Sequence, residues 1–172
     1  MRIYILLILI AGSLLNACAQ VQMNYSTKSK KAIKLFEKAR NAPGQFADEN
    51  TGKPNYQEGI KLLKQAVGKA PSFWEAQLLM AEFYEFDNNY PAAIKQYEIA
   101  LKLNPMHSSS GATFCYLANL HLALGNYTEA LRYCDRFLKN PNASIRLSPQ
   151  VYLMRRRAEC EIHALANPKE FN

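Results

Sequence analysis

Three similar segments of the chain constrain its fold more than any other feature. Each opens with Asn-Tyr, continues with apolar residues at helical spacing and closes on a proline; they read NYQEGIKLLKQAVGKAP (55–71), NYPAAIKQYEIALKLNP (89–105) and NYTEALRYCDRFLKNP (126–141). The first two begin 34 residues apart and the last two 37 apart. The three extra residues fall in a polar stretch around Ser108 to Ser110, where an insertion costs little. Such self-similarity indicates a repeat array, whose units bury their apolar faces against one another.

Each unit is expected to be a pair of antiparallel helices. Small residues recur where the two helices of a pair would come closest: Ala81 and Ala93 in the middle copy, and Ala118 and Ala130 in the third. A larger side chain there would push the helices apart. Glycine and asparagine tolerate positive φ and therefore suit the turns between paired helices. These turns are predicted at Asn88-Asn89 and at Gly125-Asn126.

The first unit is altered, and a final helix follows the third unit. The first helix is predicted over 27–42 and its partner over 56–70, with an inserted loop at 43–54 that is rich in Pro, Gly and Asn. The final helix is predicted over 148–166, with Ser148 as N-cap and Pro149 at the first helical position. This helix is expected to cap the stack through Tyr152, Ala158 and Ile162.

The sequence therefore predicts an all-α fold, because no strand pattern is present. The expected architecture is a right-handed α-solenoid of about three helix pairs plus a C-terminal capping helix. The domain covers 25–172, and its units lie at about 27–73, 74–107 and 111–144.

The order of residues at this spacing resembles the tetratricopeptide repeat (TPR). In the copy at 74–107 the residues at the family's signature positions are Ala76, Met80, Ala81, Tyr84, Tyr90, Ala93, Tyr97, Ala100, Leu101 and Pro105. The copy at 111–144 matches through Phe114, Leu117, Ala118, Gly125, Tyr127, Ala130 and Leu138, and departs at Cys134 and Phe137. The resemblance implies a protein-binding scaffold in which the first helix of each pair lines an inner groove.

Groove positions carry over from the family to this sequence. They are Glu75, Leu78, Glu82 and Glu85 in the middle copy, Cys115, Asn119 and Leu122 in the third, and Arg155 on the capping helix. Family members that bind a C-terminal carboxylate have Lys, Asn and Arg at these places, whereas only Asn119 and Arg155 fit here. Carboxylate binding is therefore not carried over, and a groove that is acidic at one end and basic at the other would instead suit a mixed-charge helix or extended segment of a partner protein.

The N-terminus has the layout of an export signal. Met1-Arg2 is followed by an apolar stretch from Ile3 to Leu15, which is shorter than the roughly 20 residues of a transmembrane helix. In one interpretation Leu15-Asn16-Ala17-Cys18 resembles a bacterial lipobox, so that 1–17 is removed and Cys18 is lipidated. In the other, Ala17-x-Ala19 is the cleavage site and 1–19 is removed. Both place the protein outside the cytoplasm, and only lipidation would attach it to a membrane.

The residues that carry chemistry do not form a catalytic set. Glu82 and Glu85 share a helix face, as surface carboxylates commonly do, and His107, His121 and His163 lie far apart in the sequence. The remaining cysteines (Cys115, Cys134 and Cys160) fit no zinc spacing and are interpreted as small buried hydrophobes, with a Cys134–Cys160 disulfide as the alternative. The sequence predicts no enzyme activity, no cofactor and no metal site.

The formal net charge of +7 raises the question of nucleic acid, but the Lys and Arg residues are scattered as on solvated helix faces. No nucleic-acid partner is predicted.

A closer resemblance is carried by Tyr25 to Phe36, Thr51 to Leu63 and Pro71 to Ala76. These segments are similar to the N-terminal region of Bacteroidetes-type envelope proteins. Those proteins join TPR units to a β-propeller and an OmpA-like peptidoglycan-binding domain, and some serve gliding and type IX secretion.

The second resemblance covers 25–172, and the chain stops where the propeller would begin. Peptidoglycan anchoring is therefore not carried over. What the resemblance implies is an interaction module at the periplasmic face of the outer membrane, in an envelope or secretion assembly, with another envelope protein as partner. The alternative is a structural spacer that self-associates and binds no peptide ligand.

Overall fold

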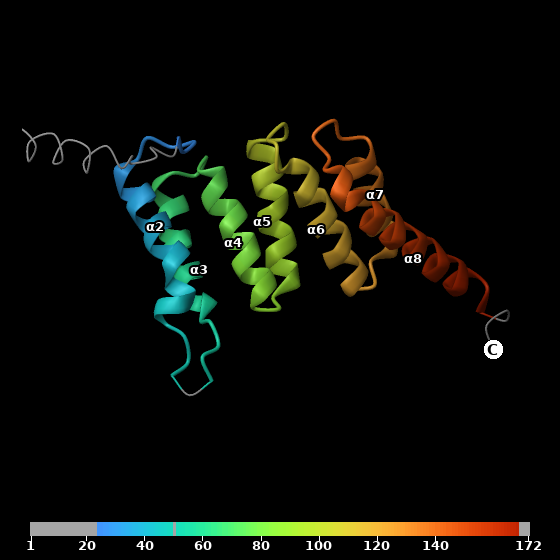
Figure 1. Cartoon of the computed structure of the whole chain (residues 1–172), viewed down its shortest axis with the longest axis horizontal. Helices are drawn as coiled ribbons and strands as arrows, with labels where there is room; N and C mark the ends of the chain where they lie inside the picture. Colours follow the sequence, from blue (N-terminus) through green and yellow to red (C-terminus); the bar gives the residue numbers. More distant parts are fainter. Residues whose placement is uncertain (1–23, 50, 169–172) are drawn as a thin grey trace, which may run out of the picture.

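The computed structural model describes residues 24–49 and 51–168, and all regular elements within these ranges are helical. Three antiparallel pairs are followed by a single helix: α2 (Lys30–Gln45) and α3 (Tyr56–Lys69), α4 (Trp74–Phe86) and α5 (Tyr90–Leu103), α6 (Ser110–Ala123) and α7 (Tyr127–Leu138), a 3₁₀ turn η1 (Ile145–Leu147), and α8 (Ser148–Ala166). Figure 1 shows these helices side by side in one row, from α2 at one end to α8 at the other. This row is the predicted right-handed α-solenoid.

Small residues hold the paired helices close together, as predicted. Ala81, Ala93, Ala118 and Ala130 are all completely buried. In the first pair Gly59 takes the place of alanine. A Cβ atom built there would lie 3.3 Å from the carbonyl oxygen of Ala39 on the paired helix α2, and 2.4 Å from the ring of Phe83 on α4 of the next pair. The repeat spacing thus identified the positions that have no room for a longer side chain.

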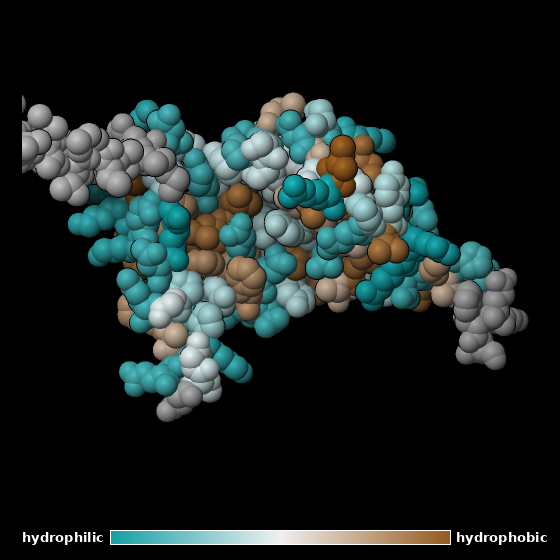
Figure 2. All heavy atoms as spheres, viewed as in Figure 1, coloured by the Kyte–Doolittle hydropathy of each residue, from teal (hydrophilic) through white to brown (hydrophobic). Residues whose placement is uncertain are grey.

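Each pair needs its neighbours to complete a core. One cluster of buried residues joins α2, α3 and α4 around Leu63 and Phe73, and a second joins α4 to α8 around Leu117 and Tyr133. Tyr84 packs against both clusters and links them. Figure 2 shows apolar side chains in the seam between the first pair and α4, beside the hydrophilic side chains of α2. Stacking therefore removes apolar surface that a lone pair would expose.

The predicted turns adopt the expected backbone. Asn88 has φ of 59° and Gly125 has φ of 73°, both in the left-handed region. Asn55 and Asn89 then cap the helices that follow, with side chains that accept hydrogen bonds from the backbone N–H groups of Gln57 and Ala92. Asn126 makes no such side-chain bond, although it occupies the same position in its repeat.

The first helix differs from its predicted bounds. It begins at Lys30, where Ser29 accepts a hydrogen bond from the N–H of Ala32, and it continues through Pro43 to Gln45. The inserted loop is therefore shorter at its start than 43–54. Pro43 has no N–H to donate, but its carbonyl accepts a hydrogen bond of 3.1 Å from the N–H of Asn55. The chain that returns from the loop thus provides a hydrogen-bond donor to a carbonyl group at the end of α2. Local composition alone did not indicate this contact.

The capping helix has the predicted range of 148–166 but different contacts. Its first residue is Ser148, so the predicted N-cap is wrong: Leu147 takes that position without a side-chain cap, and Pro149 is the second helical residue. Ala158 is buried as predicted, together with Val151 and Met154, whereas Tyr152 is 58% exposed, so its predicted contact with the preceding repeat is wrong. Successive residues of an α-helix are rotated by about 100° around its axis. Because Val151 faces the core, its neighbour Tyr152 lies on the side of the helix.

The remaining sequence predictions concern cysteines and the membrane. Cys115 and Cys134 are buried, as interpreted, but Cys160 is exposed, so that interpretation is wrong for Cys160. All three thiols are free, so the alternative of a Cys134–Cys160 disulfide is not formed. The predicted signal and the lipid site at Cys18 lie outside the described residues. Among the helices that the structure does describe, none combines the length and the apolar character needed to cross a membrane.

Candidate partner-binding site

The first helices of the pairs (α2, α4 and α6), together with α8, form a surface that we call the inner face. The predicted groove residues come from three of these helices: Glu75, Leu78, Glu82 and Glu85 from α4, Cys115, Asn119 and Leu122 from α6, and Arg155 from α8. These residues differ in burial and in their contacts, and only Glu82 and Glu85 belong to one cluster.

Glu82 and Glu85 lie at the centre of this cluster, one turn apart on α4. The hydroxyl of Tyr97 on α5 donates a hydrogen bond of 2.8 Å to Glu85 Oε2. The ring of Tyr97 stacks on Tyr116 of α6, with centroids 5.7 Å apart and planes at 29°. Tyr97 is buried, whereas Tyr116 is 41% exposed. We call Glu82, Glu85, Tyr97 and Tyr116 the acidic cluster.

The electrostatics of the acidic cluster disfavour further negative charge. Burial, and then the charge of Glu85, raise the pKa of the Glu82 carboxyl. Burial and the same carboxylates raise the pKa of the Tyr97 and Tyr116 hydroxyls, and burial and Glu85 raise that of the Cys115 thiol. A cation beside the two carboxylates would relieve this repulsion, and the exposed ring of Tyr116 offers it a π face.

Glu75 is engaged by the chain itself. Its carboxylate accepts hydrogen bonds from the backbone N–H of Ser26, at 2.8 Å, and from the Ser26 hydroxyl. Tyr25 beside it packs edge-on against Phe36 and Phe73, with ring centroids 5.3 and 5.7 Å away. The segment before α2 therefore covers the start of α4, and its hydrogen bonds engage the Glu75 carboxylate that was predicted to face a ligand.

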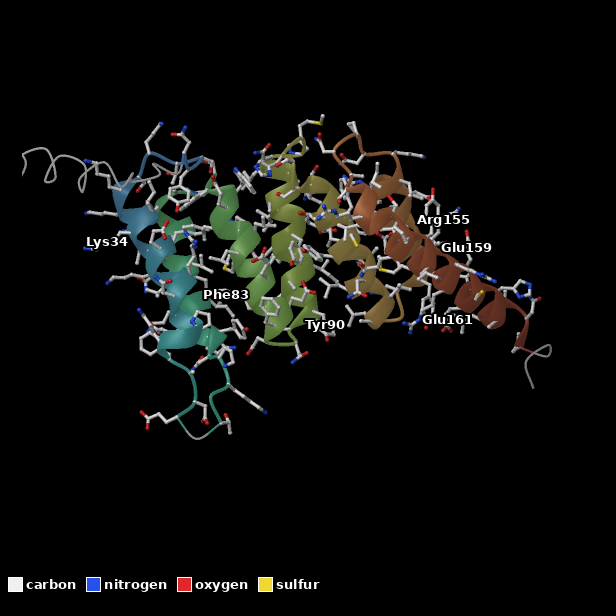
Figure 3. All side chains as sticks on the ribbon, viewed as in Figure 1. Lys34, Phe83, Tyr90, Arg155, Glu159 and Glu161 are labelled. Carbon is white, nitrogen blue, oxygen red and sulfur yellow. The ribbon has the colours of Figure 1, made fainter. Side chains whose placement is uncertain are left out.

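The α6 and α8 positions also differ from a simple groove. Cys115 and Leu122 are only 2% and 4% exposed and belong to the second core cluster, so the structure corrects their predicted places on the groove surface. Asn119 is exposed and Leu78 is half-buried. Arg155 pairs with Asp135 at 3.2 Å and with Glu159 at 3.1 Å. Figure 3 shows Arg155 and Glu159 on successive turns of α8. The positive charge predicted for this end is balanced by two carboxylates.

The histidines and cysteines are dispersed. His107 contacts Trp74 at 4.1 Å between ring centroids, and His121 is buried and stacks on Tyr133. Within residues 24–49 and 51–168, no group of three or more His, Cys, Asp or Glu side chains is placed to hold a metal ion.

Comparison with known proteins defines the family. Residues 54–105 and 84–149 match the model of the tetratricopeptide repeat family. The chain belongs to this family. Its TPR solenoid is similar to the crystal structure of the Sgt2 TPR domain from Aspergillus fumigatus, with a TM-score of 0.59 and 16% identity over 81% of this chain and 83% of that one. At this identity the likeness shows the fold. No curated protein matches the chain.

The TPR fold is typical of scaffolds that bind proteins or peptides. The family resemblance predicted the two carboxylates of the acidic cluster but gave Tyr97 only as a signature position of the repeat and did not mention Tyr116. Helix α6 carries no Asp, Glu, Lys or Arg, so a tyrosine among its apolar residues was the available signal. Its stacking on Tyr97 depends on the neighbouring repeat, which the helical pattern does not describe.

Proposed function

We propose that this TPR protein is a non-enzymatic adaptor that binds a segment of a partner protein on its inner face. The ligand segment presents a Lys or Arg side chain to the acidic cluster. The partner is another protein of the bacterial envelope, and the complex serves an envelope or secretion assembly. The export pattern of residues 1–20 and the resemblance to envelope proteins support a location at the periplasmic face of the outer membrane.

One observation carries the docking proposal. Glu82 and Glu85 are half-buried, and no Lys or Arg of residues 24–49 or 51–168 forms an ion pair with either. Two neighbouring carboxylates in a partly desolvated place repel each other and destabilise the free protein. A partner cation would remove that repulsion on binding, which gives both affinity and charge specificity.

Site-specific photocrosslinking in cells tests the docking proposal. The full chain carries the photoreactive residue at Tyr116 on the inner face, or at Gln65 on α3 as a control position. We expect a discrete crosslinked partner from position 116 only. Glu82→Lys should abolish that product, and Glu49→Lys in the exposed loop, the same charge change, should leave it. Crosslinking that is equal at both positions, or insensitive to Glu82→Lys, would contradict the proposal.

Location and lipid attachment have a separate test. Mass spectrometry of the mature protein distinguishes an acylated N-terminus at Cys18 from a chain that begins at Gln20. We expect one of these two species. An intact N-terminus at Met1 in the soluble cytoplasmic fraction would remove the envelope part of the proposal and leave inner-face docking to its own test.

A second candidate function is a spacer that self-associates. It is favoured by the exposed apolar side chains of α8, where Leu153 is 69% and Leu165 is 71% exposed. Light scattering of the purified chain discriminates between the two functions. A stable oligomer that Leu153→Lys converts to a monomer supports the spacer, and a monomer in the unmodified protein supports the adaptor.

A further inference from the structure

A second charged surface lies on the side of the solenoid formed by the second helices of the pairs. Between α5 and α7 there is a cleft of about 360 Å³, lined among others by Leu101, Lys102, Arg132, Tyr133 and Arg136. We call it the outer cleft. None of its lining residues belongs to the acidic cluster or to the predicted inner groove.

Aromatic rings hold the arginines of the outer cleft in place. The guanidinium carbon of Arg132 lies 4.4 Å from the ring centroid of Tyr133. That of Arg136 lies 4.5 Å from the centroid of Phe114 and 5.6 Å from that of Tyr133. Tyr133 is 1% exposed and Phe114 is 6% exposed, so the rings form a rigid floor. Guanidinium groups stacked on such a floor lose less rotamer freedom when they bind an anion.

The charges of the outer cleft are only partly compensated. Glu98 accepts a hydrogen bond of 2.5 Å from the Tyr133 hydroxyl, and Arg132 pairs with Glu129 at 2.6 Å. Within the described part of the chain, neither Lys102 nor Arg136 forms an ion pair with a carboxylate. These two cations extend from different helices into the same cleft.

We infer that the outer cleft binds an acidic segment of a protein, with a Glu or Asp carboxylate held by Arg136 and Lys102. The planar guanidinium accommodates a carboxylate in bidentate geometry, and Lys102 adds a point charge from the opposite helix. The buried apolar surface of Leu101 suits the stem of a glutamate. The inference rests on the proposed docking function and extends it, because the two surfaces would hold two segments of opposite charge.

Fluorescence anisotropy with a labelled decamer of glutamate tests the outer cleft in the full chain at low ionic strength. Reversal of both cations without an ion pair, in Lys102→Glu/Arg136→Glu, should weaken binding by about tenfold or more, because two attractive contacts with the peptide become repulsive. The matched control Lys30→Glu/Lys31→Glu makes the same change in net charge on α2 and should stay within about twofold. Arg136→Lys keeps the positive charge but removes the planar guanidinium group that binds a carboxylate in bidentate geometry. We expect this variant to bind the decamer with an affinity between those of the unmodified protein and the reversed variant.

The outcomes separate the alternatives. Equal weakening by both double variants, or no binding of the decamer, would overturn the inference. Displacement of the decamer by inorganic phosphate at equal concentration would show a general anion site and overturn the assignment to a protein segment. If the reversed variant loses its helical circular dichroism, Lys102→Gln/Arg136→Gln replaces it. Glu82→Lys should keep decamer binding, so that failure of inner-face docking and failure of the outer cleft are distinguishable.

Discussion

The hydroxyl of Tyr97 on α5 donates a hydrogen bond to the carboxylate of Glu85 on α4 across a distance of 2.8 Å. Tyr97 is also one of the largest fully buried side chains, so one residue joins the core of the repeat to its candidate binding surface. The position of Glu85 therefore depends on the packing of the helix pair. This coupling makes the acidic cluster a fixed feature of the fold rather than a set of free surface carboxylates.

Tyr97→Phe should destabilise the protein by about 1–2 kcal/mol, because the buried hydroxyl bond to a carboxylate is lost while the ring stays. Urea denaturation measures the change. Tyr90→Phe is the control, since its hydroxyl bonds to exposed Asn88 at 3.2 Å, and it should change the free energy of unfolding by less than about 0.5 kcal/mol. Equal effects of the two variants would show that the Tyr97–Glu85 bond contributes nothing specific.

Glu82→Gln should stabilise the unliganded protein at neutral pH. The pKa of Glu82 is raised in the folded state, so the folded state binds the proton more tightly than the unfolded state. Stability therefore falls as the pH rises from the unfolded value through the folded one, and at neutral pH the ionised carboxylate is unfavourable. The advantage of Gln should disappear as the pH falls below the usual range of glutamate.

Urea denaturation of Glu82→Gln at pH 7 and pH 4 measures this effect. Glu49→Gln in the exposed loop, the same change of side chain, serves as the control. A constant offset for Glu82→Gln at both pH values would contradict the assigned ionisation. A loss of partner crosslinking in the same variant, together with the gain in stability, would show that the cluster is kept for binding.

His121 should make the fold acid-sensitive. It is 8% exposed, neither ring nitrogen has a hydrogen-bond partner among the described residues, and burial lowers its pKa. The unfolded state therefore binds more protons, so stability is complete above about pH 6.5 and falls as the pH decreases toward the folded value. His121→Phe keeps a ring beside Tyr133 and should reduce the loss of stability between pH 7 and pH 5. An unchanged loss would assign the acid sensitivity to other groups.

Two glycines of α3 should respond in opposite directions to alanine. A Cβ at Gly59 would lie 2.4 Å from the ring of Phe83, so Gly59→Ala should cost about 1–3 kcal/mol through displacement of that ring. A Cβ at Gly68 meets nothing within 4 Å, so Gly68→Ala should gain up to about 1 kcal/mol from helix propensity. Thermal unfolding of both variants measures the contrast. Stabilisation by Gly59→Ala would contradict the close helix approach at this position.

Much of the fold could be predicted from the repeat because its signal is local. Helix periodicity, Asn and Gly at turns, and small residues at fixed offsets each act over a few residues, and three copies reinforce the same pattern. The capping helix was predicted over its whole range for the same reason. Its contacts were predicted only in part: Ala158 is buried as expected, but the burial of Val151 in place of Tyr152 depends on the direction from which α7 approaches.

The sequence by itself determined the helix pairs and the order in which they stack, because a lone pair cannot bury its apolar face and the 34-residue spacing repeats the residues that meet at each contact. Only the tertiary structure decided which polar groups become available to a partner. Ser26 donates a hydrogen bond to Glu75, and Asp135 and Glu159 form ion pairs with Arg155. The guanidinium group of Arg136 stacks on the ring of Phe114. Most of these contacts join residues far apart in the chain, so the separation in space of two helices sets them rather than any local pattern.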